Sequence, residues 1–290
     1  MVEAIFTIGI SGSGKTTWAR NQEGYMVLDS DQIRYEIYGD ASCQDNPAKV
    51  FEIMYQRGRG LLRANQSVIF CSTNLSMKNR INAIRQLQNA NPETTFRAVV
   101  LNVPLNICLS QNVARDRIVP EYVLRRQMAQ FQMPVAAEGW DKIEIITPRK
   151  YDRVKFCRGV WKDVDAAGNQ ENPHHTLVLR DHLIKTIENL NITHMSDENK
   201  ISMIEAAAVH DIGKCYTRSY DDLHVAHYYG HDNYGAYISM NMGMPFEVIQ
   251  LVNYHMLPFN KQGISTWQAR LGEELWNKIM ILHDADTRAK

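Results

Sequence analysis

Strand-like and helix-like segments alternate through the first half of the chain, and this alternation narrows the possible folds more than any other feature. Short apolar and β-branched runs predict strands at residues 2–8, 25–28, 68–71, 98–103 and 143–146. Between them, apolar spacings of three and four predict helices at residues 16–21, 32–38, 49–64, 78–88, 106–116 and 121–131. Such a succession is typical of a parallel sheet with helices on both faces.

The second half of the chain has a different pattern. A stretch rich in Pro, Gly, Asp and Asn follows residue 146, and all later segments are compatible with amphipathic helices. All ten histidines lie between His174 and His283. We therefore predict an α/β domain over residues 1–150, a linker over 151–172 and an all-α domain over 173–290.

Charge and cysteine content exclude several classes of protein. Lys plus Arg and Asp plus Glu each number 32, so the chain lacks the positive charge of a nucleic-acid coat or a polybasic membrane binder. No apolar run reaches the ~20 residues of a membrane span. Five scattered cysteines without a C-x-x-C pair are typical of reduced thiols. We expect a cytoplasmic protein without a membrane partner.

A phosphate-binding motif follows the first predicted strand. Residues 9–16 match the pattern G-x-x-x-x-G-K-[ST] and precede a predicted helix. Glycines let backbone N–H groups face phosphate oxygens, the lysine reaches the β and γ phosphates, and the threonine hydroxyl binds Mg²⁺. The predicted nucleotide-binding residues are Gly9, Ser11, Gly12, Ser13, Gly14, Lys15, Thr16 and Thr17.

An acid and a base follow the second predicted strand. Asp31 and Arg34 lie three residues apart, on one side of a starting helix. Asp31 could accept the proton of an attacking hydroxyl while Arg34 binds a neighbouring phosphate. The alternative is a helix start at Ser30 or Asp29 with an ordinary ion pair in its first turn.

Several runs in this half, in this order, resemble those of phage-type P-loop 5′-OH polynucleotide kinases. They are residues 7–20, DSDQIR after the second strand, Ser72–Leu75, Val103-Pro104 and RDRIVP at residues 115–120. The resemblance covers about residues 1–150. It implies that Lys15 and Thr16 hold ATP and Mg²⁺, and that Asp31 is the general base.

The same resemblance assigns three arginines. Arg34 would contact the nucleic-acid phosphate next to the 5′-OH, and Arg115 would stabilise the transferring phosphoryl group, with Arg117 able to replace it. The chain departs from the family at Ser72, where an acid is usual. That departure removes a carboxylate from the surroundings of the Mg²⁺ site.

Metal-competent side chains in the second half resemble those of HD-superfamily metal-dependent phosphohydrolases, over about residues 173–290. His210 and Asp211 are adjacent at the end of a predicted helix, His175 precedes them and Asp286 follows. Two imidazoles and two carboxylates suit Mn²⁺, Fe²⁺, Ni²⁺, Zn²⁺ or Mg²⁺. Such an ion lowers the pKa of bound water and supplies hydroxide to attack phosphorus.

Three further residues extend this predicted site. Lys214 follows Asp211 by three residues, so it can face the same ligand and hold the scissile phosphate. His231 and His255 match the extended pattern of HD enzymes that bind two metals.

The remaining histidines have simpler interpretations. Packed core positions are expected for His182, His194 and His283. His224 and His227 lie in a polar loop, where substrate contact and plain solvation are both open.

The two resemblances together imply an enzyme that heals broken RNA or DNA ends. The first domain would phosphorylate a 5′-OH, and the second would remove a 2′,3′-cyclic phosphate or 3′-phosphate, leaving ends for a ligase. Arginines available near the nucleic acid would be Arg34, Arg80, Arg85, Arg115, Arg125 and Arg126. The alternatives are a small-molecule or nucleoside kinase fused to an HD nucleotidase, and a nucleotide-gated scaffold with only one active site.

Overall fold

The computed structural model describes residues 2–115, 117–172, 176–260 and 263–289. The chain divides into two compact units. Unit 1 comprises Met1–Gln127 and Pro134–Lys150, and unit 2 comprises Met128–Met133 and Tyr151–Lys290. The predicted domain border at residue 150 falls where the chain passes from unit 1 to unit 2, whereas Met128–Met133 was expected in the first domain.

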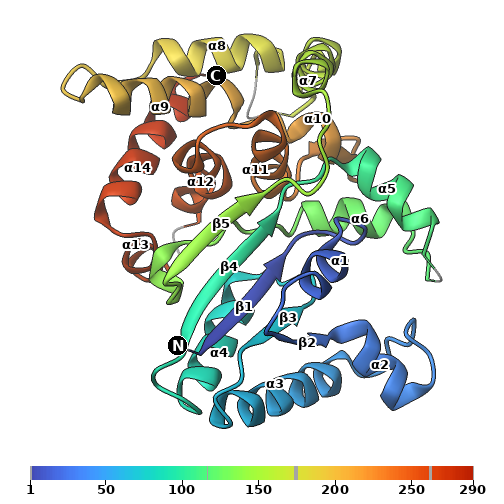
Figure 1. Cartoon of the computed structure of the whole chain (residues 1–290). Coiled ribbons are helices and arrows are strands. Elements are labelled where there is room, and N and C mark those ends of the chain that lie inside the picture. Colours follow the sequence, from blue (N-terminus) through green and yellow to red (C-terminus); the bar gives the residue numbers. More distant parts are fainter. Residues whose placement is uncertain (1, 116, 173–175, 261–262, 290) are drawn as a thin grey trace. The chain divides into compact units, whose positions relative to one another are not determined.

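Unit 1 is a parallel sheet with flanking helices, which confirms the predicted α/β fold (Figure 1). Its five strands follow the order β2-β3-β1-β4-β5. The strands are β1 (Glu3–Ile8), β2 (Met26–Asp29), β3 (Val68–Cys71), β4 (Thr95–Leu101) and β5 (Lys142–Ile146). The helices are α1 (Lys15–Arg20), α2 (Ser30–Tyr38), α3 (Pro47–Arg63), α4 (Met77–Gln88), α5 (Leu105–Val113) and α6 (Glu121–Met128), with a 3₁₀ turn at Ala136–Glu138.

Successive residues of the central strands face opposite layers of unit 1. Ile5 lies in register with Ile69, and both belong to the apolar cluster that includes Ala19 of α1. The next residue along β3, Phe70, packs on the other face, against α3. There a Cβ at Gly58 would lie 2.4 Å from the Phe70 ring, so only glycine permits this approach.

A buried ion pair joins α4 to the 3₁₀ turn before β5. Arg80 donates two parallel hydrogen bonds of 2.7 Å to the carboxylate of Glu138, and a further pair to the backbone oxygens of Asn74 and Leu75. Both charged side chains are fully buried. Arg80 is therefore structural, and the prediction that it is available to nucleic acid was wrong.

Unit 2 is built almost entirely of helices, as predicted for the second half. They are α7 (Arg153–Ala167), α8 (Leu179–Glu188), α9 (Asp197–Val209), α10 (Lys214–Thr217), α11 (His231–Met242), α12 (Phe246–Tyr254), α13 (Ile264–Leu271) and α14 (Glu273–Thr287), with a 3₁₀ turn at Leu257–Phe259. The packing of α11 against α12, and of α8 against α9, forms the centre of this unit. Within the described residues, no helix is long and apolar enough to cross a membrane.

The segment Met128–Met133 is bound into unit 2 through its backbone. The Asn253 side chain accepts from Met133 N at 2.5 Å and donates to Phe131 O at 3.1 Å. The amide of Asn233 donates to the backbone oxygen of Ala129 at 3.0 Å, and the Phe131 ring packs edge-on against Tyr237. The local sequence pattern does not reveal this connection, because the partners of the segment lie more than 100 residues further along the chain.

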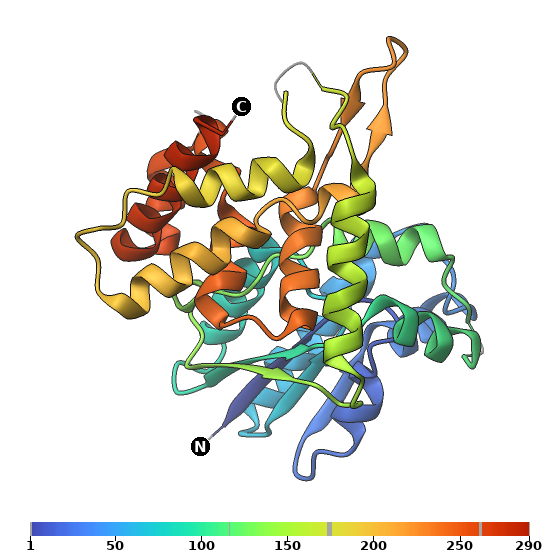
Figure 2. The same cartoon turned by 90° about the horizontal axis from the view of Figure 1, so that it is seen from above.

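Two elements differ from the prediction for the second half. The expected linker contains α7, whose Val160 and Val164 are buried one helical turn apart and whose first turn is capped by Asp152. A short hairpin, β6 (Ser219–Tyr220) with β7 (Ala226–His227), interrupts the helices and extends beyond them in Figure 2. The Asp221 carboxylate stabilises its turn by accepting two backbone hydrogen bonds.

Candidate active sites

The phosphate-binding loop of unit 1 connects β1 to α1, as the motif predicts. Gly12 and Gly14 have φ of 79° and 87°, and a Cβ at Gly12 would lie 2.3 Å from the backbone oxygen of Cys108. Both positions therefore require glycine. The Lys15 ammonium donates to the backbone oxygen of Ile10 at 2.8 Å. Burial lowers the pKa of Lys15, so a phosphate would bring both charge compensation and hydrogen bonds.

An aspartate that the prediction did not assign to the site lies beside the Thr16 hydroxyl, the predicted Mg²⁺ ligand. Thr16 Oγ1 donates to Asp29 Oδ2 at 2.9 Å, and Cys71 Sγ lies 3.5 Å from the same hydroxyl. Asp29 Oδ1 accepts from the backbone N–H of Asp31 at 2.8 Å and so caps α2. The chain thus places a carboxylate from β2 beside Thr16, although it has no acid at Ser72. Asp29 directly follows the strand predicted at residues 25–28, and this position could have identified it as a site residue.

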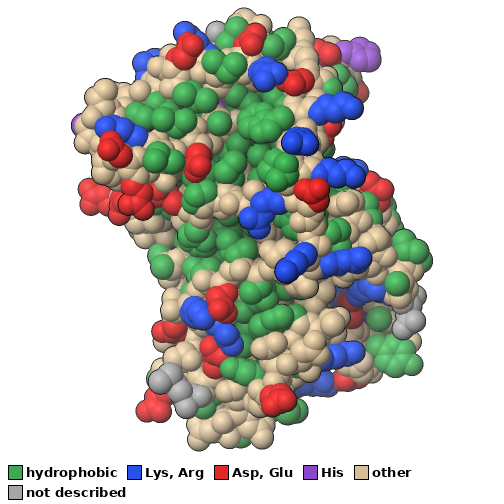
Figure 3. Space-filling model, turned by 45° about the horizontal axis from the view of Figure 1, so that its top comes forward, with side chains coloured by type: hydrophobic (Ala, Val, Ile, Leu, Met, Phe, Trp, Pro, Cys, Tyr) green, Lys and Arg blue, Asp and Glu red, His purple; other side chains and the backbone are tan. Residues whose placement is uncertain are grey.

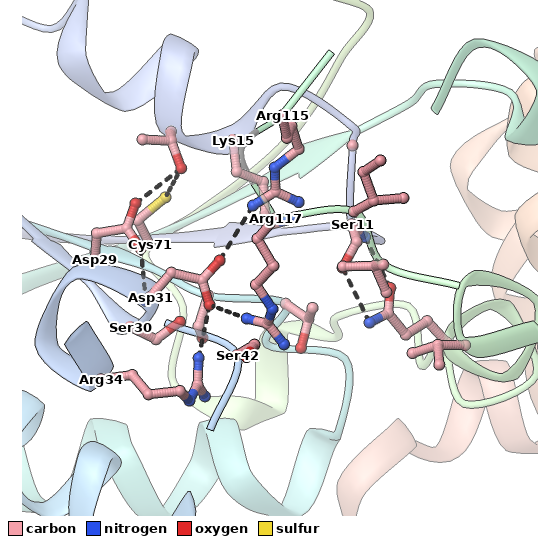
Figure 4. A pocket seen from close by; sticks show the side chains of 18 of the residues that line it. Ser11, Lys15, Asp29, Ser30, Asp31, Arg34, Ser42, Cys71, Arg115 and Arg117 are labelled. Atoms are coloured by element: carbon pink, nitrogen blue, oxygen red, sulfur yellow. Dashed lines mark hydrogen bonds and ion pairs between the residues drawn. The ribbon is translucent and has the colours of Figure 1, made fainter. Parts of the chain in front are cut away.

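Asp31 lies at the meeting point of three arginines (Figure 4). Its Oδ1 is 2.7 Å from Arg34 Nη1 and 2.8 Å from Arg117 Nη1, and its Oδ2 is 3.1 Å from Arg115 Nη2. The helix cap at Asp29 and the Asp31–Arg34 ion pair are both present, so the structural interpretation of this segment is confirmed. It does not exclude the functional one, because Arg115 and Arg117 come from a separate loop and converge on the same carboxylate.

These groups line one cavity of about 690 Å³ in unit 1. Of the predicted nucleotide-binding residues, Ser11, Gly12, Gly14, Lys15, Thr16 and Thr17 line it, with Asp31, Arg34, Arg115 and Arg117. Gly9 and Ser13 do not; Ser13 is buried beneath the loop. One face of α6 also lines the cavity, and there Gln127 accepts from Ser11 N at 2.7 Å.

A first cluster of possible metal ligands lies in unit 2. It joins His210 and Asp211, which follow α9, to Asp286 of α14 and His182 of α8. Their ligand atoms all lie within 4.8 Å of one another. His182 Nε2 is 3.1 Å from Asp211 Oδ2 and 3.2 Å from Asp286 Oδ1. All four residues are buried.

A second cluster shares Asp211 with the first. It adds His231, at the start of α11, and His255, which follows α12. Asp211 Oδ1 is 3.1 Å from His231 Nε2 and 3.6 Å from His255 Nε2. Asp211 therefore directs one oxygen toward each cluster.

The four imidazoles are oriented alike by the backbone. The Nδ1 atoms of His210, His231 and His255 lie 2.7–2.9 Å from the backbone oxygen three residues earlier, and His182 Nδ1 lies 2.7 Å from Ala289 O. Such a contact fixes the tautomer and leaves Nε2 as the metal ligand. The Nε2 atoms of His231 and His255 are buried and lack a hydrogen-bond partner. The residues present therefore fit divalent metal ions.

Electrostatics keep the shared carboxylate ionised. Burial alone would raise the pKa of Asp211, but Lys214 and the surrounding histidines lower it well below its usual value. Burial lowers the pKa of His182, yet Asp211 and Asp286 together raise it to about 10. Protonated His182 and the Lys214 ammonium therefore balance the two carboxylates, and a cation bound there would take the place of the His182 proton.

The structure changes the interpretation of several histidines. His175 lies outside the described residues. His182, expected as a core residue, is buried but stands among the ligands, because it occupies the inner face of α8 beside Leu179 and Leu183. His194 is exposed, since it lies in the loop between α8 and α9.

The other three histidines differ among themselves. His283 is half-buried and contacts the Phe259 ring edge-on. His227 pairs with Asp221 at 3.0 Å on the hairpin, and His224 adopts a left-handed turn conformation there. For His224 and His227, substrate contact and plain solvation both stay open.

Unit 1 contains the P-loop and its cavity, and unit 2 contains two clusters of possible metal ligands. Residues 5–134 match the family described as AAA domain, and residues 179–289 match the HD domain family. The chain thus carries a P-loop kinase-like domain followed by an HD domain, which confirms both resemblances at the level of the domains. The HD match begins after His175 and includes His182.

Similar solved structures share only part of the chain. The Pnkp1/Rnl/Hen1 complex is 19% identical, with a TM-score of 0.34, over 41% of this chain and 40% of that chain. A second structure, of the Pnkp1/Rnl/Hen1 RNA repair complex, is 18% identical, with a TM-score of 0.36, over 44% and 43% of the two chains. A gluconokinase from Sinorhizobium meliloti 1021 is 17% identical, with a TM-score of 0.35, over 51% and 84%. No curated protein matches the chain.

Proposed function

We propose that the chain is a bifunctional enzyme that heals broken nucleic-acid ends. Unit 1 transfers the γ-phosphoryl group of ATP to a 5′-OH, and unit 2 hydrolyses a 2′,3′-cyclic phosphate or 3′-phosphate. The observation that supports this most strongly is the cavity of unit 1, where the P-loop lysine, a candidate base and a buried arginine lie together. A ligase acting downstream would join the ends that result.

In unit 1, each residue has a role that its position supports. Asp31 accepts the proton of the 5′-OH as its oxygen attacks the γ-phosphorus, and the bond from that phosphorus to the β–γ bridging oxygen breaks to release ADP. Lys15 binds the β and γ phosphates, and Thr16 with Asp29 holds Mg²⁺. Arg115 and Arg117 stabilise charge on the transferring group.

Arg34 supports a nucleic-acid acceptor rather than a free nucleoside. It is 6% exposed, and its buried Nε has no hydrogen-bond partner. A phosphate on the 3′ side of the acceptor nucleotide would pair with this guanidinium, whereas a nucleoside has no such group. Charges of both signs share the face in Figure 3, which suits recognition of an end by few phosphate contacts.

In unit 2, the proposed ligands are His182, His210, Asp211 and Asp286 for one metal, and Asp211, His231 and His255 for a second. Bound divalent ions of the Mn²⁺, Fe²⁺, Ni²⁺ or Zn²⁺ type would supply a hydroxide nucleophile and polarise the phosphate. The chain itself orients the imidazoles, keeps Asp211 ionised and places the Lys214 ammonium where it can hold the scissile phosphate.

The proposal is tested with an oligoribonucleotide that has a 5′-OH and a 2′,3′-cyclic phosphate, and with its DNA counterpart bearing a 3′-phosphate. The protein, ATP, Mg²⁺ and Mn²⁺ or Ni²⁺ are added, and both ends are analysed. Gain of a 5′-phosphate and loss of the 3′-terminal phosphate are expected. Unchanged ends with turnover of free nucleosides would instead support the nucleotide-pool alternative.

The Arg34→Ala variant tests whether the acceptor of the kinase reaction is a nucleic acid or a free nucleoside. We expect it to lose most activity on oligonucleotides, by about tenfold or more, because a charge-assisted contact to phosphate is removed. Equal activity of the variant and the wild type on every 5′-OH acceptor would contradict a nucleic-acid role for Arg34.

A further inference from the structure

Lys214 is buried in unit 2 and contacts a carboxylate, an amide oxygen and an aromatic ring. Its ammonium lies 2.6 Å from Asp211 Oδ2 and donates to Gln170 Oε1 at 2.9 Å. The same ammonium lies over the Tyr228 ring, 5.6 Å from the ring centroid. The chain thus fixes a positive charge directly beside a candidate metal ligand.

The carboxylate oxygen that Lys214 contacts is also the one that faces the first metal cluster. Asp211 Oδ2 is 3.1 Å from His182 Nε2, and Asp286 completes that cluster. A divalent cation bound there and the ammonium would share one oxygen and repel each other at short range. In a buried site this repulsion is weakly screened.

Gln170 keeps the ammonium from leaving this position. Its side chain is buried, and its Nε2 donates to the backbone oxygen of Leu177 at 3.1 Å, so its Oε1 is turned toward Lys214. Its backbone oxygen accepts from the Tyr228 hydroxyl at 2.6 Å, which fixes the ring that faces the same ammonium. An amide oxygen and an aromatic face are both favourable neighbours for a cation.

We propose that Lys214 opposes metal binding at the first cluster, and that a phosphate group relieves this opposition by binding between the ammonium and the metal. Gln170 is the positioning residue that holds Lys214 close enough for both effects. The inference rests on the proposed metal-dependent hydrolysis in unit 2. By linkage, phosphate tightens the metal to the same degree as the metal tightens phosphate.

The probes are Mn²⁺ and inorganic phosphate, with Mn²⁺ binding measured by calorimetry on the full chain. An Asp211→Asn variant gives the background from other Mn²⁺ sites. Removing the positive charge in Lys214→Met is expected to tighten Mn²⁺ binding by about tenfold or more. Lys200→Met, which removes the same charge from a surface ion pair with Asp197, is the matched control and is expected to change nothing.

The effect of phosphate provides the second readout. In the wild type, inorganic phosphate is expected to tighten Mn²⁺ binding severalfold, and this tightening is expected to disappear in Lys214→Met. Gln170→Leu removes the acceptor that holds the ammonium beside Asp211, so Mn²⁺ binding is expected to tighten, in the same direction as in Lys214→Met but by less. The tightening by phosphate is expected to shrink in Gln170→Leu, whereas a purely structural role for Gln170 would leave it at the wild-type size.

Three results would contradict either the inference or the proposed function of unit 2. Equal or weaker Mn²⁺ binding by a folded Lys214→Met protein overturns the inference, and Lys214→Gln tests it in the same way if the Met variant does not fold. Phosphate coupling that persists without Lys214 overturns it as well. Failure of the wild type to bind Mn²⁺, Ni²⁺ or Zn²⁺ above the Asp211→Asn background refutes the proposed metal-dependent function, and the inference with it.

Discussion

Thr16 Oγ1 donates a hydrogen bond of 2.9 Å to Asp29 Oδ2, which links the P-loop threonine to the carboxyl end of β2. The same aspartate caps the helix that bears Asp31. A single side chain therefore joins the predicted Mg²⁺ position to the candidate base. The site therefore lacks an acid at Ser72 but still has a carboxylate beside Thr16, the predicted Mg²⁺ ligand.

Asp29→Asn should raise the Mg²⁺ concentration needed for half-maximal kinase activity by about tenfold. Asparagine caps helices as well as aspartate does, so α2 should persist while the negative charge is lost. Kinase assays over a Mg²⁺ series measure the effect. Asp45→Asn, an exposed loop change, is the control. An unchanged Mg²⁺ requirement would show that Asp29 only caps the helix.

His255→Ala should reduce the metal content of unit 2 from about two ions to about one. The second cluster loses a ligand, while the first cluster keeps all four of its residues. Metal analysis of purified protein, loaded after chelator treatment, gives the ratio. His283→Ala serves as the matched control, because His283 belongs to neither cluster. Two ions in His255→Ala would contradict the assignment of a second metal.

Asn253→Ala should lower the free energy of unfolding of unit 2 by about 1–3 kcal/mol. The change leaves Met133 N and Phe131 O without their buried partner. Thermal unfolding, with hydrogen exchange of residues 128–133, measures the loss. Asn191→Ala, at an exposed position, should stay within about 0.5 kcal/mol of the wild type. Equal stability of the two variants would show that the segment is not held by Asn253.

Arg126→Ala should raise the KM for a 5′-OH oligonucleotide more than Arg125→Ala does. Arg126 lines the cavity of unit 1, whereas Arg125 is outside its lining and pairs with Glu121 one turn earlier at 2.6 Å. Loss of one phosphate contact should also reduce the slope of binding against salt by about one. Steady-state kinetics at several salt concentrations compare the two variants, and equal effects would remove Arg126 from the proposed acceptor site.

Local patterns were sufficient to predict most of the fold. The strand β3 is a continuous apolar run because both of its faces are buried, and the loop from Gly9 to Thr16 is defined by glycine geometry. The helix α7 was missed because the turn-forming residues flank it, with Pro148 before and Gly168 after. The spacing of Val160 and Val164, four residues apart, could have indicated this helix.

Long-range relationships were not predictable from local patterns. Asp29 and Arg80 acquire their roles from partners far along the chain, at Thr16 and at Glu138. The sequence alone could not show which of His175 and His182 approaches His210, because both precede it and lie only seven residues apart. Only the packing of α8 places His182 beside Asp211.

The central claim is that two independent active sites act on opposite ends of one broken strand. The most direct test follows both ends of a 5′-OH, 2′,3′-cyclic phosphate oligoribonucleotide with wild type, Asp31→Ala and Asp211→Asn. We expect Asp31→Ala to lose 5′ phosphorylation by about 10²–10⁴ and to keep 3′ hydrolysis, and Asp211→Asn to show the reverse. Loss of both activities in either folded variant, or of neither, would contradict the account.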